Sequence, residues 1–324
     1  MIDGRNCRAG VVFIDLCKAF NSVDQNQLLL KLIDLYDLDP HIVRLFRNYL
    51  DNRVFKISLG DCYSTYFTEP GGIPQGSPLG NLLFTMFVND IEIAINIPYI
   101  LYADDIVIYT DGISPADIAE KLSATLEEIS KWCEINKLSI NHAKTEFMFF
   151  HKAHDTKIDH VPSVLLNGLP ITRVYSFKYL GIILDPNLSF RSHFPKIKSQ
   201  VCTAISMLQR IKRQVNFTAM KVLINAYLLS SYDYCIDIWC ILPQSEMISI
   251  QSKIHNFIKS YMFPSAYKRD RKLQKSRKFI HSRVPDNTEN LILKKFSFLT
   301  IKERLTWTLL KNTFQFMRSP VPCK

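Results

Sequence analysis

Two hydrophobic periodicities alternate along the first half of the chain. Short β-branched apolar runs at 9–16 and 145–150 predict buried strands. Apolar residues spaced three and four apart over 24–36 predict a helix, and Asp24 stands at its N-cap position. Residues 99–110 indicate strand, tight turn and strand. The first half therefore predicts an alternating arrangement of strands and helices.

Glycine, proline and serine residues place the turns and helix starts between the other elements of this half. Gly60 and Asp61 separate two short alternating runs, which predicts a hairpin. Pro115 follows Ser114 at a favoured helix start. The remaining predicted elements are helices at 40–51, 81–95 and 115–137, strands at 53–59 and 63–68, and a closing segment at 176–185.

The pattern changes from residue 192 onward, where strand signals mostly stop. Helical periodicity fills 194–213, 217–231 and 244–262. The run 267–283 then carries eight basic residues against a single acid, Asp270. We place a boundary near 186–192. The expected regions are a mixed domain at 1–188, a helical domain at 189–265, and a basic linker with a C-terminal helical tail at 266–324.

Composition is that of a folded protein with a basic excess. Hydrophobic residues make up 47% and charged residues 22%, which argues against a disordered chain. Forty Lys and Arg against thirty Asp and Glu leave +10, which favours a polyanionic partner, although many basic proteins have none. The eight cysteines form no CxxC pair, and the N-terminus lacks the apolar core of a signal peptide. We expect a soluble, intracellular protein with no membrane span.

Three carboxylates stand out because of where they lie in apolar segments. Asp15 ends an apolar strand, and Asp104 and Asp105 lie at the tip of an apolar hairpin. Burying such an acid is costly unless it is paired or binds a metal. If neighbouring strands bring the three together, hard divalent cations, which prefer oxygen ligands, would relieve their repulsion. Paired acids on a turn also occur in solvated loops, so the pair alone leaves that alternative open.

Five segments resemble, in order, the palm motifs of reverse transcriptases. Their wording is closest to the enzymes of non-LTR (LINE-type) retrotransposons, particularly jockey-like elements, which typically read FxDLxxAFDxVDH, GxPQGSxLGPLLF, YADD and YLG. The segment SYDYCIDIW at 231–239 resembles the thumb of those elements more loosely. The five segments are FIDLCKAFNSVD (13–24), GGIPQGSPLGNLLF (71–84), YADD (102–105), LSINHAKTEF (138–147) and YLGIILD (179–185).

The resemblance implies an α+β fold, the right-hand palm of a polymerase. We expect a small antiparallel sheet backed by helices, with a residual fingers-side insertion at about 38–70. An all-helical thumb at 189–265 would follow. Because the chain begins fourteen residues before Asp15, most of the fingers are expected to be missing.

The same resemblance implies an RNA-directed DNA polymerase, a nucleotidyltransferase. It would extend a DNA primer on an RNA template with dNTPs, using two Mg²⁺ ions that Mn²⁺ can replace. An active element would carry it in a ribonucleoprotein in the nucleus and cytoplasm. Two alternatives stay open: a catalytically inactive nucleic-acid-binding remnant, and a group II intron or retron-type reverse transcriptase, which shares YADD.

Positions that match the motifs imply roles at the catalytic centre. Asp15 and Asp104 would bind both ions, with Asp105 assisting and the Leu16 carbonyl completing one coordination shell. Phe20 falls where the family places its steric gate, a flat ring that excludes a 2′-hydroxyl. An ordinary core phenylalanine is the alternative.

Further matching positions imply contacts around that centre. Gln75 and Gly76 would contact the nucleotide or template, with a purely structural turn as the alternative. Lys144 would donate a proton to pyrophosphate, with a solvated surface lysine as the alternative. A primer grip would consist of a turn that supports the primer strand, although ordinary core and turn residues give the same pattern. Its residues would be Tyr179, Leu180 and Gly181.

The basic run suits contacts with a nucleic-acid backbone, and a solvated linker is the alternative. Two positions depart from the family pattern: Asn21 stands where Asp is usual, and Gln25 where His is usual. Neither is an expected metal ligand. The basic residues in question are Lys268, Arg269, Arg271, Lys272, Lys275, Arg277 and Lys278.

Overall fold

The structure is a computed structural model that describes residues 8–68, 71–152, 161–236, 238, 241 and 244–262. The chain divides into two compact units, Met1–Phe177 and Lys178–Lys324, each of which is described by itself. The predicted nucleic-acid-backbone residues of the basic run lie outside the described residues.

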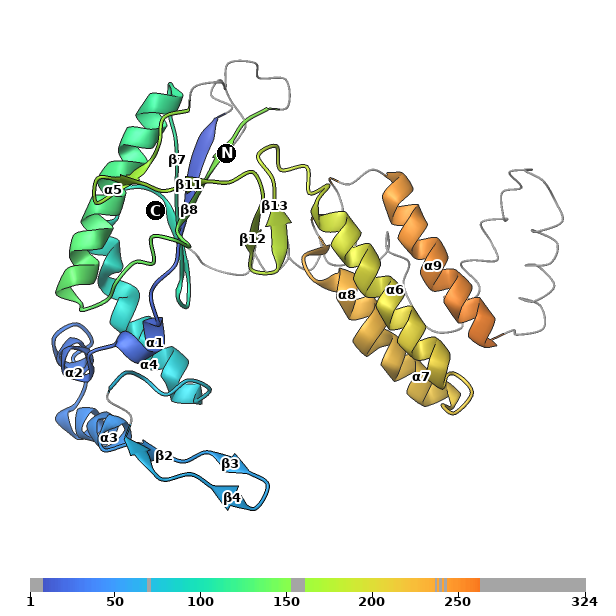
Figure 1. Cartoon of the computed structure of the whole chain (residues 1–324), viewed down its shortest axis with the longest axis horizontal. Helices are drawn as coiled ribbons and strands as arrows, with labels where there is room; N and C mark the ends of the chain where they lie inside the picture. The colour runs from blue at the N-terminus through green and yellow to red at the C-terminus, as the bar shows by residue number, and fades with distance from the viewer. Residues whose placement is uncertain are drawn as a thin grey trace. The chain divides into compact units, whose positions relative to one another are not determined.

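A five-stranded sheet forms the centre of the first unit (Figure 1). Its order is β11-β8-β1-β7-β6, so β1 lies in the middle and is buried along nearly its whole length. The strands are β1 (Ala9–Ile14), β6 (Tyr99–Tyr102), β7 (Asp105–Asp111), β8 (Glu146–Phe150) and β11 (Thr172–Arg173).

The sheet is mixed, whereas the sequence predicted an antiparallel one. The pairs β1–β7, β1–β8 and β6–β7 are antiparallel, as expected. The edge strand β11 runs parallel to β8. It re-enters the sheet after the short hairpin of β9 (Leu165–Leu166) and β10 (Leu169–Pro170), and this detour gives the chain room to return in the direction of β8.

Capping side chains set where the helices of the first unit begin. The N-cap side chains Asp24, Ser77 and Ser114 each accept a hydrogen bond from a backbone N–H of the first turn. The helix predicted at 81–95 starts at Pro78 instead, because Ser77 caps it and Pro78 suits the first turn. The helices are α1 (Ala19–Ser22), α2 (Gln25–Asp34), α3 (Pro40–Leu50), α4 (Pro78–Val88), the 3₁₀ helix η1 (Asn89–Ala94) and α5 (Pro115–Ile135).

The first core lies between the sheet and its helices, and α5 packs directly on β1 and β7. Gly10 makes this close approach possible. A Cβ at position 10 would lie 2.4 Å from Cγ2 of Ile118 and 2.7 Å from Cδ1 of Leu122. The helix therefore rests on the strand at a point where any side chain would push it away.

A hairpin is present where Gly60 and Asp61 predicted one, but its ladder is interrupted. Strands β2 (Val54–Phe55) and β5 (Phe67–Thr68) pair at the base, and β3 (Ser58–Leu59) and β4 (Cys62–Tyr63) pair near the tip. It projects beyond α3 in Figure 1.

The second unit is mainly helical, as the sequence predicted. Residues 217–231 are helical throughout but include a π-helical turn, η2. The second core gathers apolar residues from α6, η2 and α9, and includes Val201, Leu228 and Phe257. The elements are β12 (Phe177–Tyr179), β13 (Ile182–Leu184), α6 (His193–Ile211), α7 (Phe217–Leu223), η2 (Ile224–Leu229), α8 (Ser230–Asp233) and α9 (Gln244–Met262).

The division between units falls after Phe177, earlier than the boundary expected near 186–192. Ile182, Leu184 and Leu188 explain the shift, because they pack against the second core. The β12–β13 hairpin therefore belongs mostly with the helices. No helix in the described part of the chain is long and apolar enough to cross a membrane.

The packing at Gly10 yields a stability prediction. Gly10→Val should lower the free energy of unfolding by about 1–3 kcal/mol, because the added methyl groups collide with α5. Urea unfolding followed by fluorescence measures the change. Ala9→Val is the control, since Ala9 is partly exposed and faces the other side of the strand. Equal midpoints for Gly10→Val and wild type would contradict the prediction.

Candidate active site

Strand register places two of the three predicted acids at the same end of the sheet. Ile14 pairs with Ile106 at the last rung of the β1–β7 ladder. Asp15 directly follows Ile14, and Asp105 directly precedes Ile106. Partial burial raises the pKa of Asp105 above its ordinary value, and the negative charges of Asp104 and Asp15 raise it further. The three acids therefore interact electrostatically.

A tight turn presents the third acid. Tyr102 pairs with Asp105, so Ala103 and Asp104 alone connect β6 to β7. Ala103 has a φ of 52°, in the left-handed region that short hairpin turns require. Asp104 is exposed at the tip, where its carboxylate can reach a ligand.

The segment before β8 holds Asp15 from the other side. The Asp15 carbonyl accepts a hydrogen bond from the Asn141 amide at 2.8 Å, and the Asp15 amide donates to the Thr145 hydroxyl at 3.4 Å. This brings Lys144 Nζ to 3.8 Å from Asp15 Oδ2. Because both side chains are substantially exposed, the ion pair contributes little to stability. Leu16 follows with a bridge to Ile140, which fixes its backbone.

The donor set suits a hard divalent cation. Carboxylate and carbonyl oxygens are the ligands such ions prefer. The pKa of Asp105 is raised first by partial burial and then by the charges of Asp104 and Asp15, so a cation bound here would favour its ionised form. Among the described residues, however, no three His, Cys, Asp or Glu side chains group closely enough to hold one ion. Mutual repulsion between unneutralised carboxylates favours such an open arrangement.

A glycine-rich loop is fastened to the chain just after Asp15. The Ile73 amide donates to the Phe20 carbonyl at 2.8 Å, and the Gly72 amide to the Val23 carbonyl at 3.2 Å. A Cβ on Gly72 would lie 2.7 Å from the Phe20 oxygen, so only glycine allows this contact. The loop thereby stays beside the residues that follow the first acid.

The two predicted loop residues are open to solvent. Gln75 and Gly76 are both exposed, and Gly76 has a φ of 83°. Gln25 steadies the loop from below by donating through Nε2 to the carbonyls of Gly72 at 2.9 Å and Leu50 at 3.2 Å. This departure from the family pattern therefore has a structural role.

Phe20 has a packing partner and is still accessible. Its ring stacks on Phe84 with centroids 4.4 Å apart, and it is only half-buried at the edge of the first core. The ring is thus held in place by α4 while part of it remains open.

In the second unit, the predicted grip residues form a turn that two side chains hold. Leu180 and Gly181 have φ values of 43° and 87°, and they link β12 to β13. The Tyr234 hydroxyl donates to the Leu180 carbonyl, and Lys196 Nζ donates to the Gly181 carbonyl at 2.7 Å. A Cβ on Gly181 would meet the Tyr234 ring at 3.4 Å. Tyr179 is partly buried beside this turn.

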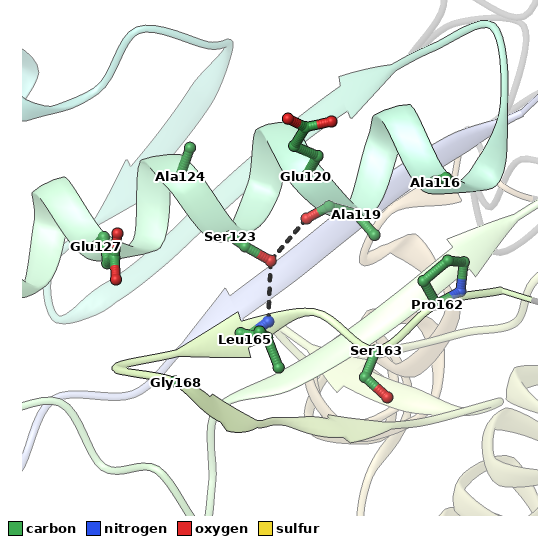
Figure 2. Close-up of a pocket in the computed structure, with 10 residues that line it drawn as sticks. All are labelled: Ala116, Ala119, Glu120, Ser123, Ala124, Glu127, Pro162, Ser163, Leu165 and Gly168. Atoms are coloured by element: carbon green, nitrogen blue, oxygen red, sulfur yellow. Dashed lines mark hydrogen bonds between the residues drawn. The ribbon is translucent and has the colours of Figure 1, made fainter.

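A cavity of about 460 Å³ lies elsewhere, between α5 and the β9–β10 hairpin (Figure 2). Ser123 joins the two by donating to the Ala119 carbonyl and accepting from the Leu165 amide. Glu120 and Glu127 line it, and their charge would repel phosphate. None of the predicted site residues lines this cavity.

Comparison with known families matches residues 3–184 to the reverse transcriptase (RNA-dependent DNA polymerase) family. The chain belongs to the reverse transcriptase family. This confirms the resemblance seen in the palm motifs.

Two relatives of this chain are mobile-element polymerases of Drosophila. The RNA-directed DNA polymerase from mobile element jockey of Drosophila funebris is 30% identical over 208 residues, 62% of this chain and 22% of the relative. The probable RNA-directed DNA polymerase from transposon BS of Drosophila melanogaster is 28% identical over 260 residues, 77% of this chain and 28% of the relative. The chain thus spans about a quarter of the length of these relatives.

A solved structure, telomerase from Candida albicans in complex with a fragment of telomeric RNA, is also similar. The TM-score is 0.43 at 11% identity, over 86% of this chain and 52% of that chain.

Sequence reasoning assigned no role to four residues that hold predicted site residues in place, two in each unit. Tyr234 lies in the segment that resembled a thumb, which was the available signal. Gln25 was noted only as a departure. Lys196 and Thr145 carried no local signal, because their partners lie 15 and 130 residues away.

The acid cluster yields a pH prediction. The pKa of Asp105 is higher in the folded chain than in the unfolded chain, so folding favours the protonated carboxyl. The contribution of Asp105 to stability is therefore present at low pH and is lost as the pH rises through the folded-state pKa. In metal-free buffer at about pH 7, Asp105→Asn should therefore melt higher than wild type, and the difference should shrink toward about pH 4.

Thermal melts in EDTA at several pH values measure this difference. Asp111→Asn is the matched control, because it removes a carboxylate from the opposite end of the same strand. A melting difference for Asp105→Asn that stays constant with pH would contradict the electrostatic account.

The held turn yields a second prediction for the site. Tyr234→Phe removes the hydrogen bond to Leu180 and should speed amide exchange around residues 180–182, by an amount corresponding to about 0.5–1.5 kcal/mol. Hydrogen exchange read by mass spectrometry measures it. Tyr227→Phe, at an exposed tyrosine in η2, should leave these amides unchanged. Identical exchange in both variants would show that the hydroxyl does not hold the turn.

Proposed function

We propose that this chain is the polymerase part of a non-LTR retrotransposon reverse transcriptase, which adds deoxynucleotides to a primer 3′-hydroxyl on an RNA template. One observation carries the proposal: the β1–β7 register brings Asp15 and Asp105 to the same end of the sheet, where their charges interact with that of Asp104. Membership of the family supports it.

The sheet with α4 and α5 is proposed as the palm, and the helices of the second unit as the thumb. A palm needs carboxylates at a strand end and a neighbouring hairpin tip, and the first unit has both. A helical unit that carries the turn at Leu180 and Gly181 suits a thumb with its primer grip.

Asp15, Asp104 and Asp105, with the Leu16 carbonyl, are proposed to hold two Mg²⁺ ions, which Mn²⁺ can replace. When bound, two such ions stabilise both the attacking and the leaving oxygen of a phosphoryl displacement. The carboxylates would hold the ions in place, and most of the catalysis would then be positioning and electrostatics.

Residues around the acids are proposed to bind the nucleotide. Phe20, braced by Phe84, would lie under the sugar and exclude a 2′-hydroxyl. Gln75 and Gly76, on the fastened loop, would contact the nucleotide or the template. Lys144, held 3.8 Å from Asp15 Oδ2, would donate a proton to the departing pyrophosphate.

The turn of Tyr179, Leu180 and Gly181 is proposed as the primer grip. Both turn carbonyls already accept hydrogen bonds from Tyr234 and Lys196. The turn can therefore support a primer strand without rearranging its own backbone.

Primer extension tests the proposal. With an RNA template, a DNA primer, dNTPs and Mg²⁺, the chain should extend the primer, and Asp104→Ala should reduce the rate by at least about 1,000-fold. Asp111→Ala, which removes an exposed acid from the opposite end of β7, is the matched control and should keep the wild-type rate. RNA binding without extension by the wild-type chain would instead indicate an inactive nucleic-acid-binding remnant.

A further inference from the structure

The hairpin at residues 53–68, here called the aromatic ribbon, exposes an unusual amount of apolar surface. From Val54 to Thr68 every residue is exposed except Ser64, which is partly buried. Leu59 is 82% exposed and Tyr66 is 69% exposed. Exposed large apolar side chains gathered in one short segment are a feature of interaction sites. The exposed large apolar residues are Val54, Phe55, Ile57, Leu59, Tyr63, Tyr66 and Phe67.

The ribbon holds its own shape. The amides of Ile57 and Ser64 each donate across it, to the Ser64 hydroxyl and the Ile57 carbonyl respectively, both at 2.9 Å. Phe55 and Phe67 stack with centroids 5.5 Å apart at its base. Its aromatic rings are therefore presented on a preformed scaffold, which reduces the entropy lost when a ligand binds.

A cation lies among the tyrosines. Lys56 Nζ is 4.0 Å from the Tyr63 ring centroid and 5.8 Å from that of Tyr66. The adjoining helix α3 adds Arg44 and Arg47, both exposed, and neither forms an ion pair within the described residues. Over residues 40–68 the charges are four Lys or Arg against two Asp, a net +2.

We propose that the aromatic ribbon binds a single-stranded nucleic acid, with bases stacked on Tyr63 and Tyr66 and phosphates beside Lys56. Flat rings with an interleaved cation are the features that proteins use for single strands, because every base has a face to stack and every linkage a negative charge. The proposal rests on the proposed function, since the ribbon leads along the chain into the loop of Gln75 and Gly76. It would extend the path of the template beyond that loop.

A second copy of the chain fits the ribbon less well. A symmetric contact would bring the net positive charge of residues 40–68 against itself. The two ladders have only two residue pairs each, which offers little edge for strand addition. A polyanion meets the same surface with complementary charge.

Fluorescence anisotropy with the full chain tests the proposal. The probe is a fluorescein-labelled single-stranded oligouridylate of about 12 nucleotides, with an oligothymidylate of equal length as a second arm. Tyr63→Ala/Tyr66→Ala should weaken binding by roughly 5- to 150-fold for each stacked base lost. The arm that loses affinity identifies RNA or DNA as the strand bound.

Two further variants sharpen the result. Tyr63→Phe/Tyr66→Phe keeps the rings and should bind as wild type. Tyr175→Ala is the matched control and should leave the Kd unchanged. It removes another exposed tyrosine, whose ring centroid lies 5.0 Å from the guanidinium carbon of Arg173. Circular dichroism melts confirm folding, since every substituted side chain is exposed.

An unchanged Kd for the double alanine variant overturns the proposal. A second outcome would also overturn it: the wild-type chain sediments as a dimer, and the double alanine variant sediments as a monomer with unchanged oligonucleotide affinity. The ribbon would then be a contact between copies of the chain. Performing the binding assay in an Asp104→Ala background separates the two proposals. If primer extension fails but the double alanine variant still weakens oligonucleotide binding, only the polymerase proposal is wrong. If primer extension succeeds but the double alanine variant binds the oligonucleotide as wild type does, only the ribbon proposal is wrong.

Discussion

The antiparallel pairing of β1 with β7 is the constraint on which the candidate active site depends. Residues directly opposite each other in a ladder are fixed to within one rung, and a slip of one residue would turn every side chain to the other face. The buried residues of β1 and β7 oppose such a slip, because it would move Val12 and Ile108, both 0% exposed, out of the core that they now fill. The hydrophobic core therefore determines where the acids lie. The burial of apolar side chains elsewhere in the unit offsets the repulsion among the three carboxylates.

Much of the architecture could be predicted because it follows from local patterns. The periods of two and 3.6 identified the strands and helices, and Asp24 and Ser114 stand as caps where the sequence placed them. The positions of Asp15 and Asp104 at a strand end and a hairpin tip also follow from the pattern. The approach of those two elements does not, because strand order is a property of the whole fold.

Contacts between distant residues account for what the sequence left undetermined. The parallel edge strand β11 depends on a detour through the β9–β10 hairpin, which leaves no mark in the periodicity. The division after Phe177 depends on which core Ile182 and Leu184 join, and both cores are hydrophobic. Likewise, the sequence around Lys196 is that of an ordinary surface lysine on a helix, and only the fold shows that it donates to the Gly181 carbonyl. Roles assigned to single motif residues remain predictions for the same reason.

The absence of a side chain at Gly10 also has a genetic consequence. Every single-base substitution that replaces a glycine introduces a residue with a Cβ or a stop codon. At this position even alanine places that atom 2.4 Å from Cγ2 of Ile118. No missense change at Gly10 can therefore leave the packing of α5 on β1 unaltered.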